Sequence, residues 1–303
     1  MASSSQIENV RAANAGTQFL HVDGLRMAYH DSGDTSGALP TILCVHGNPT
    51  WSYYFRRVEQ EFSGRCRVIR VDHIGCGESE KPPPDRFEYR LSRHQENLSS
   101  LIEQLDLRRI ILLAHDWGGA IGLGGLLRQR DRFCGLALLN TAAFPPPYVP
   151  LRIAACRIPL LGTLAIRGAN LFARAAIKMA MNRNSLDADV ASDLLAPYDS
   201  WTNRVAIDGF VRDIPMTKRH PTHQTLVELE SRLPSLGDVP SLLVWGMKDW
   251  CFRPECLRRF QSVWPGATSV EIDDAGHYVM EDAPREVLDA IGRFLKHKIE
   301  CVA

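Results

Sequence analysis

Short apolar runs alternate along most of the chain with segments that have helical periodicity. The runs are rich in Val, Ile and Leu, which is typical of buried strands. The clearest helical pattern is Ser92–Leu105, where Leu98, Leu101, Ile102 and Leu105 recur at the spacing of one helix face. The predicted strands are Phe19–Val22, Arg26–His30, Thr41–Val45, Arg67–Val71, Arg109–His115, Cys134–Leu139, Ser241–Trp245 and Ser269–Ile272.

The predicted helices stand between these strands and indicate the α/β class. Alternation of this kind predicts a mostly parallel sheet with helices on both faces. The first two strands are an exception, because Asp23-Gly24 between them is typical of a hairpin turn. The predicted helices are Ser52–Phe62, Ser92–Leu105, Ala120–Arg130, Glu255–Val263 and Pro284–Lys298.

The alternation stops after Thr141, where the run Phe144-Pro145-Pro146-Pro147 marks a change of composition. From there the sequence carries only helical signals until the strand rhythm resumes. We therefore predict a helical cap inserted after the sixth strand, covering the edge of the sheet where such folds place their sites. The predicted division is a core of residues 1–144 and 216–303 and a cap of residues 145–215.

Composition and charge exclude several classes of function. The 303 residues suit one large domain with an insertion. The chain has 35 basic and 35 acidic residues, so neither a nucleic-acid surface nor an acidic tail is expected. No uncharged apolar run reaches the roughly 18 residues that a membrane-spanning helix needs. The stretch Met1–Asn9 is Ser-rich without an apolar segment, so we expect no signal peptide and a cytoplasmic location.

The eight cysteines are scattered, and none of their spacings is that of a zinc site. Cys251 and Cys256 come nearest to a motif, but the spacer between them is long for a pair of metal ligands. We expect reduced, partly buried thiols and neither a metal nor a cofactor.

A sharp turn is predicted where the apolar run from Arg109 meets His115-Asp116-Trp117-Gly118-Gly119. Small, helix-compatible residues follow, so the pattern is strand, turn and helix with Asp116 at the tip. In the α/β-hydrolases this turn, the nucleophile elbow, has the motif Gly-x-nucleophile-x-Gly and holds the nucleophile above the sheet. Here Ala114 replaces the first glycine. Taken alone, an Asp before a helix is more often an N-cap, so the hypothesis depends on partners elsewhere in the chain.

Two further polar residues follow later strands and complete a catalytic order. Asp249 comes after the strand that ends at Trp245, and His277 comes after the last strand. Nucleophile, acid and histidine in this order are typical of α/β-hydrolases. Asp273 and Asp274 also carry carboxylates, but they precede His277 too closely to reach its far nitrogen and are interpreted as loop caps.

The stretch His46-Gly47-Asn48-Pro49 offers a second group of candidates. A loop here can present the backbone N–H of Asn48 to an oxyanion, together with the N–H of Trp117 after the elbow. Both side chains also carry N–H donors, and the indole is a donor only. Two donors aimed at one apolar spot suit an anion without a proton, such as a halide.

These motifs together resemble the haloalkane dehalogenases, from about residue 20 to 297. The residues that carry the resemblance are His46-Gly47-Asn48-Pro49, Asp72-His73-Ile74-Gly75-Cys76-Gly77, His115-Asp116-Trp117-Gly118-Gly119 and Asp274-Ala275-Gly276-His277. The resemblance implies an α/β-hydrolase fold. It also implies Asp116 as nucleophile, His277 as base, and Asn48 and Trp117 as halide ligands. The family places its acid after either of two strands; Leu139-Asn140-Thr141 holds no carboxylate, so the acid is assigned to Asp249.

Three stretches are similar to the third dehalogenase subfamily and even more to the β-lactone decarboxylases of long-chain olefin synthesis: Asn140–Phe144, Arg167–Phe172 and Ala196–Trp201. Both groups share the catalytic set, so the sequence leaves two substrates open: a haloalkane, hydrolysed to alcohol and halide, or a β-lactone, converted to alkene and CO₂. Epoxide hydrolases fit less well; they use two cap tyrosines, for which Tyr148 and Tyr198 are candidates, but Asn48 is unexpected there. Fluoroacetate dehalogenases use arginines after the nucleophile, and Trp117-Gly118-Gly119-Ala120 has none.

The expected partner is a small apolar substrate. A hypothesis of another class is a non-catalytic or assembly-bound scaffold, because Leu160–Met181 carries much apolar surface. That surface would bind other copies, partner subunits or a membrane face; the alternative is a cap helix packed on the core. Chain-length preference, oligomeric state and the roles of the cap residues are not determined by the sequence.

Overall fold

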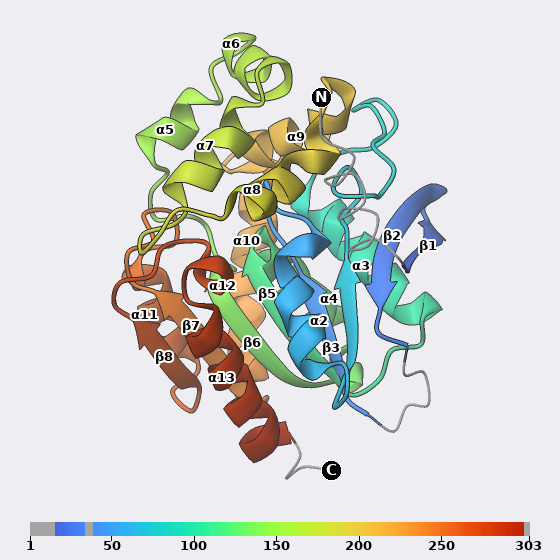
Figure 1. The fold of residues 1–303 in the computed structure, drawn as a ribbon, viewed down its shortest axis with the longest axis vertical. Coiled ribbons are helices and arrows are strands. Elements are labelled where there is room, and N and C mark those ends of the chain that lie inside the picture. The colour runs from blue at the N-terminus through green and yellow to red at the C-terminus, as the bar shows by residue number, and fades with distance from the viewer. Residues whose placement is uncertain (1–15, 34–38, 300–303) are drawn as a thin grey trace.

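Eight strands form one sheet in the order β1-β2-β4-β3-β5-β6-β7-β8 (Figure 1). The computed structural model describes residues 16–33 and 39–299, so the start of the chain and Cys301 lie outside the described residues. The strands are β1 (Thr17–Val22), β2 (Leu25–Asp31), β3 (Thr41–Val45), β4 (Arg67–Val71), β5 (Ile110–Asp116), β6 (Phe133–Thr141), β7 (Ser241–Gly246) and β8 (Thr268–Ile272).

Most of the sheet is parallel, which confirms the predicted class. The strands β3 to β8 pair in parallel throughout. The strands β1 and β2 form the predicted hairpin, and β2 also runs antiparallel to β4. Asp23 and Gly24 at the hairpin turn have φ of 54° and 73°. Two central residues with positive φ give the turn a twist that matches its flanking strands.

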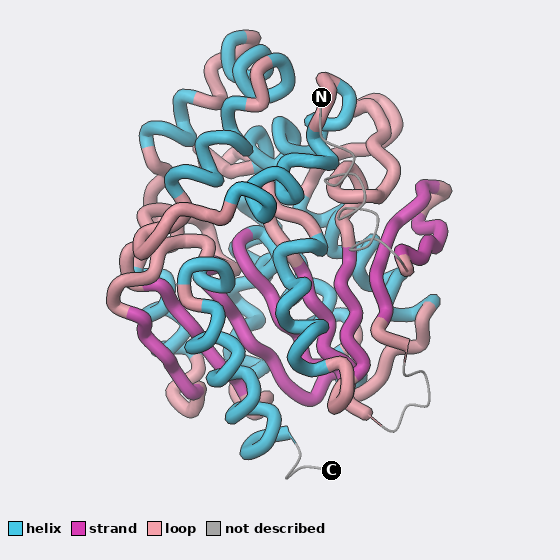
Figure 2. Tube along the Cα trace, in the orientation of Figure 1, coloured by secondary structure: helices cyan, strands magenta, loops and turns pink. Residues whose placement is uncertain are grey.

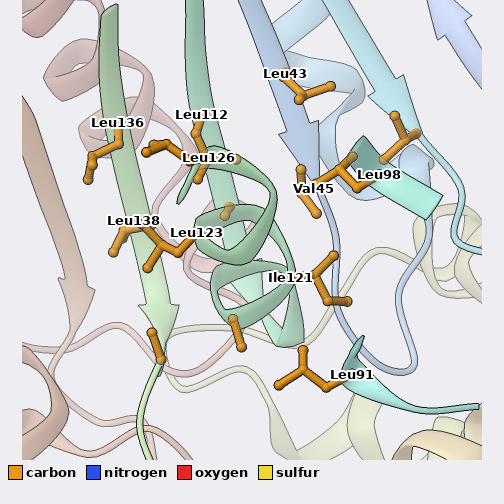
Figure 3. Close-up of a cluster of buried hydrophobic side chains, with 14 of the residues drawn as sticks. Leu43, Val45, Leu91, Leu98, Leu112, Ile121, Leu123, Leu126, Leu136 and Leu138 are labelled. Carbon is orange, nitrogen blue, oxygen red and sulfur yellow. The ribbon is translucent and has the colours of Figure 1, made fainter. Parts of the chain in front are cut away.

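Helices cover both faces of the sheet because the strands are apolar on both sides. Leu43 and Val45 of β3 point into one core, and Ile42 and Cys44 point into the other. Figure 3 shows two side chains of α4 against the strands, with Leu126 near Leu112 and Leu123 near Leu138. The first core is covered by α3 (Leu91–Gln104), α4 (Trp117–Arg128), α10 (Pro221–Arg232) and α11 (Pro254–Val263). The second is covered by α2 (Arg56–Phe62), α12 (Val279–Asp282) and α13 (Pro284–Phe294).

The stretch from β6 to residue 215 is helical and contains no strand, as the sequence predicts. Figure 2 shows these helices gathered at one end of the sheet. Their bounds are α5 (Leu151–Ala155), α6 (Leu161–Thr163), α7 (Leu171–Met179), α8 (Ala188–Leu195) and α9 (Val205–Asp213). The predicted borders of the cap, at residues 145 and 215, stay a prediction. Among the described helices, none is both long enough and apolar enough to cross a bilayer.

Three local features differ from the predicted elements. The helices α10 and α12 were not predicted; α10 begins at Pro221, and the His220 ring accepts the backbone N–H of Thr222 as a cap. The helix predicted over Ser52–Phe62 begins as a 3₁₀ turn. The last helix leaves the α form at Phe294 and continues as a π-helical turn. Periodicity does not distinguish these helix types over four or five residues, because so short a segment makes only about one turn.

Candidate active site

Asp116 lies where β5 passes directly into α4. Its backbone has φ 55° and ψ −130°, an uncommon conformation for a residue other than glycine. Its carboxylate makes no capping hydrogen bond to α4. Instead Oδ1 accepts the backbone N–H of Asn48 at 2.7 Å. Asp116 therefore stands at the N-cap position of α4, but its carboxylate does not cap the helix and instead accepts from the loop after β3.

Two glycines allow the chain to pack closely around the elbow, one in α4 and one in the loop after β3. A Cβ on Gly118 would lie 2.0 Å from the carbonyl oxygen of Val45, and a Cβ on Gly47 would lie 2.0 Å from Oδ1 of Asp116. Backbone oxygen cannot move aside at that distance without shifting β3. Gly118 is thus required by the close approach of the β3 backbone, and Gly47 by the close approach of the Asp116 carboxylate.

The structure brings Asp116, His277 and Asp249 together at the carboxyl ends of β5, β8 and β7. The His277 Nδ1 atom lies 2.8 Å from Oδ2 of Asp249. Its Nε2 atom lies 3.5 Å from Oδ2 of Asp116. All three side chains are buried. One imidazole therefore contacts a carboxylate on each side, which is the geometry that nucleophile, base and orienting acid need.

Asn140 belongs to this site and was missed as a site residue by the sequence analysis. It is the second-last residue of β6 and has φ 29°, and its Nδ2 atom donates to Oδ2 of Asp249 at 3.0 Å. Oδ1 of Asp249 accepts the backbone N–H groups of Cys251 and Phe252 at 2.6 and 3.1 Å. The buried carboxylate is thereby held by four donors, including His277. Its position in the sequence could have indicated this role, because Asn140 follows the earlier of the two predicted strands after which the dehalogenases place their acid.

The charges in the site hold His277 in its protonated form. Burial alone lowers the pKa of His277, but the carboxylates of Asp249 and Asp116 outweigh it and raise the pKa from 6.5 to about 10. Burial also raises the pKa of Asp249, and here the His277 charge and the hydrogen bonds from His277, Cys251 and Phe252 outweigh it and keep the pKa below 3.8. The resting site is thus an imidazolium between two carboxylates. Any event that neutralises Asp116 lowers the pKa of His277.

This arrangement predicts that the protein loses stability as the pH rises. Because the pKa of His277 is higher in the folded chain, its contribution is complete below pH 6.5 and is lost as the pH approaches about 10. One group gives a slope of at most about 1.4 kcal/mol per pH unit. Urea unfolding at a series of pH values measures it, and His277→Gln should flatten the curve in this range. The half-buried His223 provides the control: His223→Gln should keep the wild-type slope. Equal slopes in all three proteins would contradict the assignment.

Asn48 and Trp117 both line the cavity next to Asp116, as their predicted role requires. The Asn48 side chain donates a long hydrogen bond, 3.4 Å, to the carbonyl of Ile207 in the cap helix α9. The indole of Trp117 packs against Phe210 of the same helix, with 5.6 Å between ring centroids. The cap therefore positions both side chains. Their role as halide or oxyanion ligands stays a prediction.

A cavity of about 380 Å³ lies over these residues, between the sheet and the cap. Its volume suits a ligand of drug-like size. The lining is mainly apolar and comes from two stretches of the cap and from the strand ends. The apolar residues that the cap contributes include Ile153, Phe172, Ala176, Val211 and Ile214, and Leu226 of α10 adds to them. Cys251 and Cys256 also line the cavity, near Asp249.

The two tyrosines considered for epoxide opening are committed to other contacts. The hydroxyl of Tyr198 donates to the carbonyl of Thr50 at 3.1 Å and is buried away from the cavity. The hydroxyl of Tyr148 donates to the carbonyl of Trp250. Neither proton is directed at Asp116, so the site does not support epoxide hydrolysis. Asp274, interpreted as a loop residue, is exposed and bonds Arg183.

Comparisons with known proteins agree with the observed α/β fold. A family profile described as the alpha/beta hydrolase fold matches residues 40–284. The chain is 38% identical to a cis-3-alkyl-4-alkyloxetan-2-one decarboxylase of Xanthomonas campestris, over 90% of this chain and 93% of that protein. It is 30% identical to haloalkane dehalogenase 2 of Mycobacterium tuberculosis, over 88% of this chain and 90% of that protein. The solved haloalkane dehalogenase DbeA of Bradyrhizobium elkani matches in fold with a TM-score of 0.84, at 24% identity over 95% of this chain and 99% of that one.

Proposed function

The chain belongs to the α/β-hydrolase family as a haloalkane dehalogenase-like enzyme, and from this premise we propose that it opens a β-lactone carrying two alkyl chains and releases an alkene and CO₂. The observation that carries the proposal is the Asp116 carboxylate at the floor of a mainly apolar cavity of about 380 Å³. The higher identity to the decarboxylase than to the dehalogenase also supports it.

The shape of the lining suits a substrate with two chains. Ile153 and Phe172 line the cavity from α5 and α7, whereas Val211 and Leu226 line it from α9 and α10. Adjacent ring carbons of a cis-disubstituted lactone carry one chain each. Apolar walls from two separate stretches of the chain give both substituents a place to be buried, and this burial binds the substrate without polar contacts.

In the first step, Asp116 attacks the sp³ ring carbon that is bonded to the ring oxygen and carries an alkyl chain, not the carbonyl carbon. The carbon–oxygen bond of the strained ring breaks, an ester forms on Asp116, and the former lactone carbonyl becomes a free carboxylate on the neighbouring carbon. No atom is lost in this step. The negative charge moves from the Asp116 carboxylate to the new carboxylate of the substrate, which lies close to Asp116.

In the second step, the new carboxylate leaves as CO₂. The electron pair of the broken carbon–carbon bond forms the double bond, and the ester oxygen returns to Asp116 as a carboxylate. The overall reaction converts the lactone to an alkene and CO₂ and consumes no water. The imidazolium of His277, 3.5 Å from Asp116, stabilises the returning charge.

The fate of the ester depends on the proton of His277. In the lactone reaction, the released substrate carboxylate replaces the charge that Asp116 loses, so the pKa of His277 stays high and the ring cannot act as a base. This suppresses hydrolysis. With a haloalkane, the halide departs toward Asn48 and Trp117, the pKa of His277 falls, and the neutral ring can take a proton from water.

Haloalkane hydrolysis, the first hypothesis from the sequence, is the second candidate and is supported only at the level of the family. Asn48 and Trp117 beside Asp116 are the observation in its favour. In this reaction, water activated by His277 attacks the ester carbonyl. The backbone N–H groups of Asn48 and Trp117 stabilise the oxyanion, each contributing about 3–4 kcal/mol. The scaffold hypothesis has no support from a site in which all three catalytic candidates meet.

One comparison of products tests the proposal. Purified protein is given a long-chain cis-β-lactone or, separately, short bromoalkanes, and alkene, CO₂ and bromide are measured. We expect equimolar alkene and CO₂ from the lactone, at a higher kcat/KM than bromide release. A β-hydroxy acid as the main product, or faster bromide release, would show that hydrolysis is the main reaction.

A further inference from the structure

An unusually apolar part of the surface lies on the outer side of the cap. Ten large hydrophobic side chains are exposed among the described residues, and six of them lie within residues 151–171. Figure 1 shows α5, α6 and α7 at the end of the molecule away from the sheet. We call the six the leucine face: Leu151, Ile158, Leu160, Leu161, Leu164 and Leu171. Leu151 and Leu160 expose 89% and 80% of their surface, so packing on the core does not explain them.

The same segment is strongly basic in a chain whose net charge is zero. Residues 151–181 contain five Arg or Lys and no Asp or Glu. Arg152, Arg174 and Lys178 are exposed. Leucines flanked by Arg and Lys are typical of helices that lie in the interface of a membrane.

Leu160 has a backbone conformation that costs free energy. Its φ is 61°, a conformation that is strained for a bulky side chain. At an exposed turn, Gly or Asn would adopt this backbone more easily. The chain nevertheless places a leucine there, where it is almost fully in solvent.

The leucine face is continuous with the rim of the cavity. Leu171 is exposed by 54% and also lines the cavity, and Arg152 does the same from α5. An apolar molecule that leaves a lipid layer at this rim reaches the cavity without crossing water.

We propose that the leucine face docks on a membrane surface that carries anionic lipid headgroups. The leucines enter the boundary of the acyl chains, and Arg174 and Lys178 contact the headgroups. The enzyme thereby takes up apolar substrate directly from the lipid. The proposal concerns binding and is independent of which reaction follows.

Charge and composition favour lipid over the other occupants. In a two-fold dimer the same face would meet itself and place like charges together without an acidic partner. Protein interfaces draw their binding energy mainly from Trp, Tyr and Arg, and leucine is under-represented among such residues. The leucine face has no aromatic member.

Co-sedimentation of the full chain with sucrose-loaded vesicles tests the proposal. Vesicles of phosphatidylcholine and phosphatidylglycerol in equal parts are compared with vesicles of phosphatidylcholine alone. We expect binding to the anionic vesicles, weaker binding to the neutral ones, and loss of the difference at high salt.

Two variants separate the apolar and the charged contributions. Leu160→Asp/Leu161→Asp should lower partitioning by about tenfold or more. Arg174→Gln/Lys178→Gln should lower it about 25-fold, on anionic vesicles only, since each charge contributes roughly fivefold. Matched controls on the core are Val227→Asp on α10 and Arg258→Gln/Arg293→Gln on α11 and α13; both should bind like the wild type. Circular dichroism and thermal unfolding verify that the variants fold.

Three results would overturn the proposal. The first is wild-type protein that stays in the supernatant with anionic vesicles. The second is equal binding to both vesicle types. The third is a dimer in size-exclusion chromatography that Leu160→Asp/Leu161→Asp converts to a monomer, which would make the leucine face an interface between copies.

Discussion

Asp116→Asn abolishes turnover of both the lactone and the bromoalkane, with an expected loss in kcat on the order of 10⁴-fold or more. The amide has nearly the same size as the carboxylate and tolerates the positive φ of 55° at the elbow. It lacks the charge and the nucleophilic oxygen that form the ester, so the first step fails in either reaction. Steady-state kinetics with each substrate measure the loss, and the melting temperature reports on the fold.

The control for Asp116→Asn is a carboxylate that lies outside the cavity. Asp274 is exposed and pairs with Arg183, so Asp274→Asn should keep wild-type kcat. A single turnover of bromoalkane in ¹⁸O-water then tests the ester itself. If an ester forms, the first alcohol carries ordinary oxygen and the label enters Asp116. Fully labelled alcohol in the first turnover would exclude the ester.

His277→Gln separates the two reactions. With a bromoalkane, the variant should release one equivalent of bromide per enzyme and then stop, because removal of the general base slows ester hydrolysis by about 10²–10⁴-fold. With the lactone it should continue to form alkene over many turnovers, since decarboxylation needs no base. Bromide burst size, alkene yield and the mass of the peptide that contains Asp116 measure these outcomes.

The half-buried His223 on α10 gives the matched control, and His223→Gln should behave as the wild type in both assays. A stable adduct on Asp116 in the lactone reaction of His277→Gln would contradict the proposed second step. It would mean that release of the alkene requires proton transfer by the imidazole. Loss of the bromide burst would instead place His277 in the first step.

The order of the elements and the identity of the candidate residues were predictable from the sequence. Strands such as Thr41–Val45 and Arg67–Val71 agree with the structure residue for residue, because β-branched runs bounded by turns are a local signal. The ends of parallel strands meet at one edge of the sheet, so Asp116, Asp249 and His277 could be expected near one another. The helices α10 and α12 escaped, because the first begins at a proline in a polar stretch and the second is a single turn.

The sequence by itself determined the class of fold, the insertion of a helical cap and the presence of a carboxylate at the elbow. These depend on local patterns and on the fixed geometry of βα units. Only the tertiary structure decided that the Asp116 carboxylate does not cap its own helix, that Asn140 donates to Asp249, and that two carboxylates beside His277 raise its pKa. The cavity and the leucine face likewise arise from contacts between segments far apart in the chain. Side-chain orientation, burial and pKa depend on those contacts, and no local pattern contains them.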